Sequence, residues 1–426
     1  MRTTRRSFLA GAGCATTAGL LAGHGSVQAA TKTTPRKLLM VFASGGWDIS
    51  YALDPKPDLA TVDAPEGEIQ MFEDIPVFVD DSRPRVTEFF EQYAPLAAVV
   101  NGINTRSIAH DVCSRTIFTG SSSGLNPDAG AMVGHQLGRD YPVPYLVLGR
   151  TAFSGPLGVS TGRVGATNQI VVLLDPEQAY PRAPGSPYFH EGFLPDADDE
   201  ALIRQLVEAR AERERAARGQ RGHNRDRVDD FIESLAKGDL LRANAAGFGQ
   251  AGDDLQLEAQ VNLALDALEQ DLAWAVNISA DLGFDTHDDN APQGPLANGL
   301  YGGLADLAAE LTARPGSQSG NTLLDETTVV VFSEMSRTPR LNATLGKDHH
   351  AVTSALVFGA GVAGGRAYGA TNDQVQGEWI DLHTGDVSPD GQPLEADQFV
   401  AGLACLAGAD ASEFLPNVEP FDAFIA

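Results

Sequence analysis

Short apolar runs separated by polar, Gly- and Pro-containing segments recur along the chain. Runs of roughly four to eight apolar residues bounded by turn-forming residues are typical of strands that are buried on both faces. We therefore expect strands at residues 37–43, 96–100, 145–148, 170–174, 273–279, 328–332 and 355–358.

Longer segments carry apolar residues at the spacing of amphipathic helices. The charged stretch 198–246 has such a stripe, which includes Leu202, Leu206, Phe231 and Leu235. Further helices are expected at residues 255–272, 296–311 and 397–406. Because strands and helices alternate, the pattern predicts a three-layer α/β/α sandwich with a mainly parallel central sheet.

The chain shows no internal repeat and no clear linker, so we expect residues 31–426 to form a single domain. Segment 151–195 is rich in Gly and Pro and predicts an irregular excursion over the surface. The helical stretch around 196–246 is interpreted as an insertion. Its arginine-rich part, residues 210–227, indicates a solvated helix face or a lid rather than a binding site.

Residues 1–30 have the pattern of a twin-arginine signal peptide. Arg5 and Arg6 stand in Thr-Arg-Arg-Ser-Phe-Leu, an apolar stretch follows, and Val-Gln-Ala at 27–29 resembles a cleavage site. We therefore expect a periplasmic or secreted protein exported by the twin-arginine translocase. No other stretch approaches the roughly 18 apolar residues that span a bilayer, so no transmembrane segment is expected in the mature chain.

The chain is strongly acidic, with 57 Asp and Glu, 30 Lys and Arg, and a formal net charge of −27. This charge argues against nucleic acid and anionic lipid as partners. Cys14 lies in the signal, which leaves Cys113 and Cys405 in the mature chain. An oxidising compartment permits a disulfide between them, and two buried thiols fit equally well.

Carboxylates and imidazoles follow several expected strands, and ligands of parallel sheets gather at the carboxyl ends of strands. Asp285 and His287 would point to the same side of an extended segment. Asp48 and Glu334 also suit a turn or a helix cap. Imidazole and carboxylate are common ligands of divalent metals. We expect one or two ions, zinc or calcium, held by Asp48, Asp285, His287, Glu334, Asp348 and His349.

Residues 110–120 form a second candidate region, with hydroxyls, a thiol and an arginine after an expected strand. A nucleophile there would need activation by a metal or a base, whereas an ordinary strand-to-helix turn is the simpler interpretation. Arginines can grip an anionic ester oxygen or compensate nearby acids. The candidate catalytic residues are His110, Ser114, Arg115, Arg337 and His350.

Three motifs carry a resemblance to a known family. They are Gly-Phe-Asp-Thr-His at 283–287, Ser-Glu-Met-Ser-Arg-Thr-Pro-Arg at 333–340, and Gly-Lys-Asp-His at 346–349. Behind a twin-arginine signal, these motifs resemble domain of unknown function 1501. The resemblance covers essentially the whole mature chain. It implies a branch of the alkaline phosphatase and sulfatase superfamily, with an α/β/α sandwich and a metal centre at the sheet edge.

The resemblance also implies roles for individual residues. Asp48 resembles the aspartate ligand after the first strand, Asp285 and His287 resemble an aspartate–histidine ligand pair, and His349 resembles the late histidine ligand. Glu334 stands where the superfamily has an aspartate after a strand. The usual histidine after it is replaced by a methionine.

A further departure concerns the nucleophile. Residues 114–120 resemble the sulfatase Cys/Ser-x-Pro-Ser-Arg signature, but their spacing is one residue short. The usual nucleophile position then falls on His110 or Asp111, and neither side chain is a convertible Cys or Ser.

These observations favour an exported metal-dependent hydrolase of phosphate or sulfate esters that acts on a small-molecule or glycan ester. Its metal would polarise the ester and lower the pKa of a water or of a Ser or Thr hydroxyl. The alternative is a non-catalytic exported binding protein that retains the fold and a structural metal.

Overall fold

The computed structural model describes residues 34–164, 170, 196–217, 223–244 and 256–426. The expected signal peptide and most of the expected surface excursion lie outside these residues. Residues 171–174 of an expected strand and residues 218–222 of the arginine-rich patch also lie outside the described part of the chain.

An eight-stranded sheet forms the centre of the described chain, in the order β12-β4-β11-β8-β1-β7-β5-β6. Only β11 in this sheet runs antiparallel to its neighbours, and the other pairings are parallel. The strands are β1 Lys37–Phe42, β4 Ala97–Asn104, β5 Tyr145–Val147, β6 Thr161–Arg163, β7 Ala275–Ser279, β8 Thr327–Phe332, β11 Val352–Gly359 and β12 Arg366–Tyr368.

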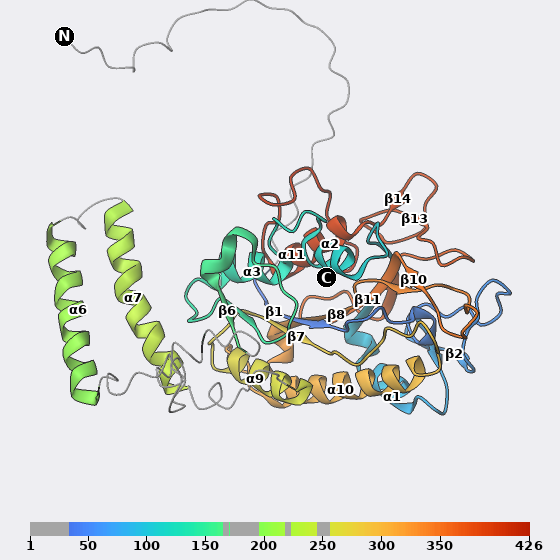
Figure 1. The fold of residues 1–426 in the computed structure, drawn as a ribbon, viewed down its shortest axis with the longest axis horizontal. Coiled ribbons are helices and arrows are strands. Elements are labelled where there is room, and N and C mark those ends of the chain that lie inside the picture. The colour runs from blue at the N-terminus through green and yellow to red at the C-terminus, as the bar shows by residue number, and fades with distance from the viewer. Residues whose placement is uncertain (1–33, 165–169, 171–195, 218–222, 245–255) are drawn as a thin grey trace, which may run out of the picture. The chain divides into compact units, whose positions relative to one another are not determined.

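Helices cover both faces of this sheet, as Figure 1 shows. On β1, Leu39 and Val41 pack into one apolar cluster, whereas Leu38, Met40 and Phe42 pack into the other. The first cluster includes α1 Pro84–Tyr93, α9 Leu257–Glu269 and α10 Gln293–Ala313. The second includes α2 His110–Thr119, α3 Ala129–Leu137 and α11 Ala396–Ala407. The predicted three-layer sandwich with a mainly parallel sheet is therefore confirmed.

The expected helical stretch around 196–246 contains two helices, α6 Ala197–Ala217 and α7 His223–Ala243. Ion pairs between Arg204 and Asp239, 2.5 Å apart, and between Arg215 and Asp229 join them. None of the described helices is both long enough and apolar enough to cross a membrane. Cys113 and Cys405 are both thiols.

The apolar pattern did not predict β12 or β6 of the central sheet, and β6 lies in the segment that was expected to be an irregular surface excursion. Several short elements outside this sheet were not predicted either. The small strands are β2 Glu68–Phe72, β3 Ile75–Val79, β9 Ser336–Arg337, β10 His349–His350, β13 Trp379–Ile380 and β14 Gln392–Pro393. The 3-10 turns are Ile49–Tyr51, Ala94–Leu96, Gly155–Ser160 and Leu324–Glu326.

The carboxyl ends of β8, β1 and β7 lie side by side because these neighbouring strands are parallel. The chain turns sharply after β1 at Gly45, whose φ is +107°. A Cβ atom on Gly45 would lie 2.9 Å from the backbone nitrogen of Asp285. A residue without a side chain is therefore required where the loops after β1 and β7 meet.

Candidate metal centre

Four polar side chains converge at this edge of the sheet. His110 begins α2, Asp285 and His287 follow β7, and His349 begins β10. Asp285 Oδ1 lies 3.2 Å from His287 Nε2 and 3.4 Å from His349 Nε2, and Asp285 Oδ2 lies 3.6 Å from His110 Nε2. The ligand atoms of His110, Asp285 and His349 all lie within 4.8 Å of one another.

Each of the three imidazoles is held through its Nδ1 atom. The acceptors are Glu334 Oε1 for His110 at 2.7 Å, Asp348 Oδ1 for His287 at 3.1 Å, and the Ile108 carbonyl for His349 at 2.7 Å. A carbonyl or an ionised carboxylate can only accept, so each Nδ1 carries a proton, and a ring in its neutral form then presents a lone pair at Nε2. This is how metal-binding histidines are usually oriented.

The Nε2 atoms face one another across the cluster. His287 Nε2 and His349 Nε2 lie 2.8 Å apart, so two neutral rings with protonated Nδ1 atoms would bring two lone pairs together. His110 Nε2 is buried and makes no hydrogen bond to the described residues. A divalent ion would satisfy all three nitrogens together with Asp285. A set of three imidazoles and one carboxylate suits zinc and its neighbours better than calcium, which prefers oxygen ligands.

Arg337 sits behind the carboxylate. Its guanidinium is fully buried, and it donates to Asp285 Oδ1 at 2.7 Å and to the Gly46 carbonyl at 2.7 Å. Burial favours the neutral form of Asp285, but the hydrogen bond and charge of Arg337 outweigh it and hold the pKa of this carboxyl below its usual value. Asp285 is therefore ionised when a cation arrives.

Glu334 is a buried acid that stays charged. Burial raises its pKa, but the hydrogen bonds from His110 and from backbone N–H groups such as that of Gly45 bring it below the usual value. The same hydrogen bond raises the pKa of His110. Burial, with His110 and Arg337 nearby, lowers the pKa of His349. The neutral form of His349 is the form a metal needs.

The comparison with known families agrees with the motifs around this centre. The family described as protein of unknown function (DUF1501) matches residues 35–384, which include all four converging residues. The chain belongs to this family. No curated protein is similar to it in sequence.

Solved structures similar to this DUF1501 chain include sulfatase and alkaline phosphatase relatives. Ps i-CgsB is 10% identical, with 91% of this chain and 75% of that chain covered and a TM-score of 0.41. PsFucS1 sulfatase from Pseudoalteromonas sp. is 9% identical (80% and 66%, TM-score 0.35). Alkaline phosphatase from the Antarctic bacterium TAB5 is 11% identical (78% and 93%, TM-score 0.32).

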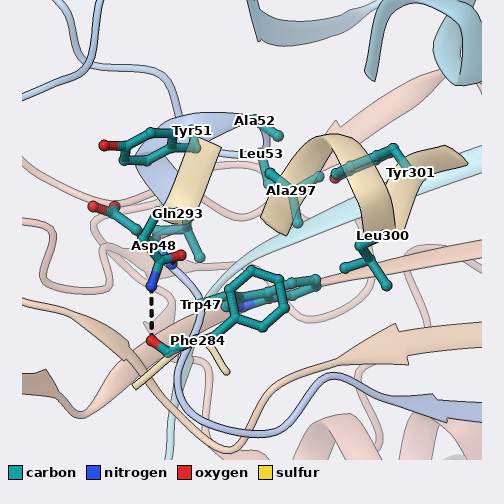
Figure 2. Close-up of a pocket in the computed structure, with 11 residues that line it drawn as sticks. Trp47, Asp48, Tyr51, Ala52, Leu53, Phe284, Gln293, Ala297, Leu300 and Tyr301 are labelled. Carbon is teal, nitrogen blue, oxygen red and sulfur yellow. Dashed lines mark hydrogen bonds between the residues drawn. The ribbon is translucent and has the colours of Figure 1, made fainter. Parts of the chain in front are cut away.

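Asp48, a predicted ligand, is not among the four converging residues. Its Oδ2 atom accepts from Lys347 Nζ at 2.8 Å and from Asn290 Nδ2 at 2.9 Å. Figure 2 shows Asp48 beside Tyr51 and Gln293, at the wall of a cavity of about 20 Å³. Metal ligation by Asp48 stays a prediction, and in this structure its carboxylate is committed to the protein.

The remaining predicted residues take several positions. Glu334 and Asp348 contact histidines rather than completing the converging set. Ser114 and Arg115 lie one turn along α2 from His110, and Arg115 pairs with Asp111 at 2.7 Å. His350 Nε2 lies 2.8 Å from the Val375 carbonyl, and burial lowers its pKa.

Two features escaped the sequence analysis. His110 was a candidate catalytic residue and not a predicted ligand, yet its Nε2 atom joins the ligand cluster, because β4 and α2 bring it to Asp285 from far away in sequence. Ser44 lies in the loop after β1, and its hydroxyl donates to Asp281 Oδ1 at 2.5 Å. A polar residue in the loop after an apolar strand was the available signal for Ser44, as it was for Asp48.

Proposed function

We propose that this chain is an exported metal-dependent hydrolase of phosphate or sulfate esters. The observation that carries the proposal is the convergence of three histidine Nε2 atoms on the carboxylate of Asp285. The Nδ1 atom of each of these histidines is hydrogen-bonded. Histidines that bind a metal usually donate their other ring N–H to a carboxylate or a carbonyl, and all three rings do so here. The ester class comes from the motifs shared with the superfamily, and export comes from the twin-arginine pattern.

His110, Asp285, His287 and His349 would hold the ion, with zinc the best match to their chemistry. A bound divalent ion supplies Lewis acidity that polarises an ester oxygen. Glu334 keeps the proton of His110 on Nδ1, so that Nε2 stays available. Arg337 keeps Asp285 ionised and fixed.

Ser44 is a candidate nucleophile, because it is adjacent in sequence to a residue that contacts the centre. Ser44 precedes Gly45, whose N–H donates to Glu334 Oε1 at 2.9 Å. Asp281 accepts the Ser44 proton in a short hydrogen bond and would act as its base. Arg150 Nε lies 3.9 Å from Asp281 Oδ2 and is exposed, so it could attract an anionic substrate.

The test is elemental analysis of the exported protein, purified without chelator, beside Asp285→Ala/His287→Ala. We expect about one equivalent of a divalent metal in the wild type and none in the variant, with p-nitrophenyl phosphate or sulfate turnover lost in parallel. His383→Ala is the control, because this histidine pairs with Asp422 outside the centre. A metal-free wild type, or turnover that survives the double substitution, would refute the proposal.

A non-catalytic binding protein is the second candidate, and Arg337 favours it. Its donors are used on Asp285 and on the carbonyls of Gly45, Gly46 and Lys347, so it has little left to offer a substrate anion. In that case, metal removal lowers the melting temperature while no ester is turned over at any metal content.

A further inference from the structure

Lys347, two residues before His349, is a buried cation that is paired with Asp48. Lys347 Nζ and Asp48 Oδ2 are 2.8 Å apart, and the two side chains are only 1% and 2% exposed. Lysine is almost never buried this completely unless it is paired. Burying both charges carries a desolvation penalty that only good geometry and further hydrogen bonds offset.

The carboxylate of Asp48 has no acceptor position left for a metal ion. Oδ2 accepts from Lys347 Nζ and from Asn290 Nδ2, and Oδ1 accepts from Ser50 N at 3.1 Å and Ser50 Oγ at 2.6 Å. An ionised carboxylate offers about four lone-pair sites. All of them face donors of the protein.

The surroundings of Asp48 do not suit a metal either. The adjoining cavity of about 20 Å³ is lined mainly by apolar groups, among them Trp47, Leu53 and Phe284 (Figure 2). This volume is enough for about one water molecule. The nearby amide oxygen of Gln293 accepts from the Asp48 N–H at 2.9 Å, so it is committed as well.

The ion pair is connected to the ligand loop through Thr286, the residue between Asp285 and His287. Asn290, which donates to Asp48, accepts from Thr286 Oγ1 at 2.9 Å. The Lys347 N–H donates to the Thr286 carbonyl at 3.1 Å. Both partners of the buried pair therefore fix the backbone that carries two of the metal ligands.

We propose that the Lys347 ammonium takes the position of a second metal ion at Asp48, so that the centre binds a single ion. Lys347 and Asp48 then act as positioning residues for Asp285 and His287. This inference rests on the proposed metal centre. It excludes Asp48 from the ligand set and explains how a buried acid at this edge is paired without a second ion.

The test measures bound zinc and zinc affinity in the full chain after loading with zinc alone. The informative variant is Asp48→Asn/Lys347→Met, which removes both charges and leaves neither buried and unpaired. We expect about one zinc equivalent in both the wild type and this variant, with zinc binding roughly 10- to 100-fold weaker in the variant. Lys37→Met is the control, because Lys37 is also buried. Its Nζ atom lies 2.8 Å from Asp271 Oδ1, and this pair is outside the metal centre.

Three outcomes overturn the inference. Two zinc equivalents in the wild type with one lost in the double variant would make Asp48 a ligand and leave the metal centre standing. Unchanged zinc affinity in the double variant would remove the positioning role. A wild type that binds no zinc overturns both this inference and the proposed function. The wild-type stoichiometry decides the single-ion claim even if the variant fails to fold.

Discussion

The three histidines of the candidate centre differ in what holds them, and this difference sets their roles. A carboxylate acceptor behind a ligand imidazole strengthens the basicity of the ring, whereas a carbonyl mainly fixes its orientation. Glu334 is almost fully buried and accepts from His110, while Asp348 is exposed and accepts from His287. The buried partner is therefore expected to matter more for metal affinity.

Glu334→Gln should weaken zinc binding by about 10- to 100-fold, because the amide keeps the shape of the side chain but loses its charge toward His110. The measurement is a competition titration against a chelator of known affinity. Glu419→Gln is a matched control, since Glu419 lies 3.3 Å from His383 Nε2 in another Glu–His pair. Equal effects of the two substitutions would contradict the role given to Glu334.

Asp128 carries a pH dependence that is independent of the metal. It caps α3 by accepting from Ala131 N at 2.8 Å, and full burial raises its pKa to about 6. Its folded pKa lies above the unfolded value, so the folded state binds more protons and the free energy of unfolding falls as the pH rises from about 4 to about 6. The loss is roughly 3 kcal/mol in total.

Urea denaturation of the wild type and of Asp128→Asn across this pH range checks the sign. Asparagine is also a good N-cap but does not titrate, so the stability advantage of the wild type should shrink toward neutral pH. An advantage that is constant or grows with pH would show that Asp128 is already ionised at acid pH in the folded protein.

At the scale of elements, the turn after β1 is tightly constrained. Gly45→Ala places a Cβ atom 2.9 Å from Asp285 N in a left-handed conformation. We expect a loss of roughly 1–3 kcal/mol in the free energy of unfolding and weaker zinc binding, because the loop that carries Asp285 must move. Denaturation and zinc titration of the same preparation measure the two effects.

Gly303→Ala is the control for that substitution. Gly303 lies inside α10, and a Cβ atom there has no neighbour within 4 Å. Alanine favours a helix interior by roughly 0.5–1 kcal/mol over glycine, so this variant should be neutral or stabilised with unchanged zinc affinity. If Gly45→Ala behaved in the same way, the close contact with Asp285 would have no energetic meaning.

The apolar runs predicted six of the eight strands of the central sheet, because burial on both faces leaves a continuous hydrophobic signal, but they missed the short strands β6 and β12. The two-residue strands β9 and β10 could not be predicted, since tertiary contacts rather than local pattern create them. The residues of the candidate site also differ in how far local sequence could predict them. Asp285 and His287 were recognisable from their spacing, whereas the approach of His110 depends on the position of α2, which one sequence does not encode locally.

Lys347 illustrates the limit most clearly. In the sequence it is one charged residue in a polar stretch, and such residues are usually solvated. Only the packing of the loop before β10 against Asp48 turns it into a buried cation. The sequence could therefore suggest Asp48 as a ligand but could not reveal that a lysine already satisfies it.

At the scale of the whole molecule, the centre joins loops that follow β1, β4, β7 and β8, together with β10, so ligand binding should stabilise the entire domain. An ion that binds only the folded state adds about 2.7 kcal/mol at a free concentration of 100 Kd. Chelation should therefore lower the melting temperature by several degrees. Asp285→Ala/His287→Ala should melt near the chelated wild type and should not respond to chelator. A chelator effect of equal size in that variant would place the stabilising ion elsewhere in the protein.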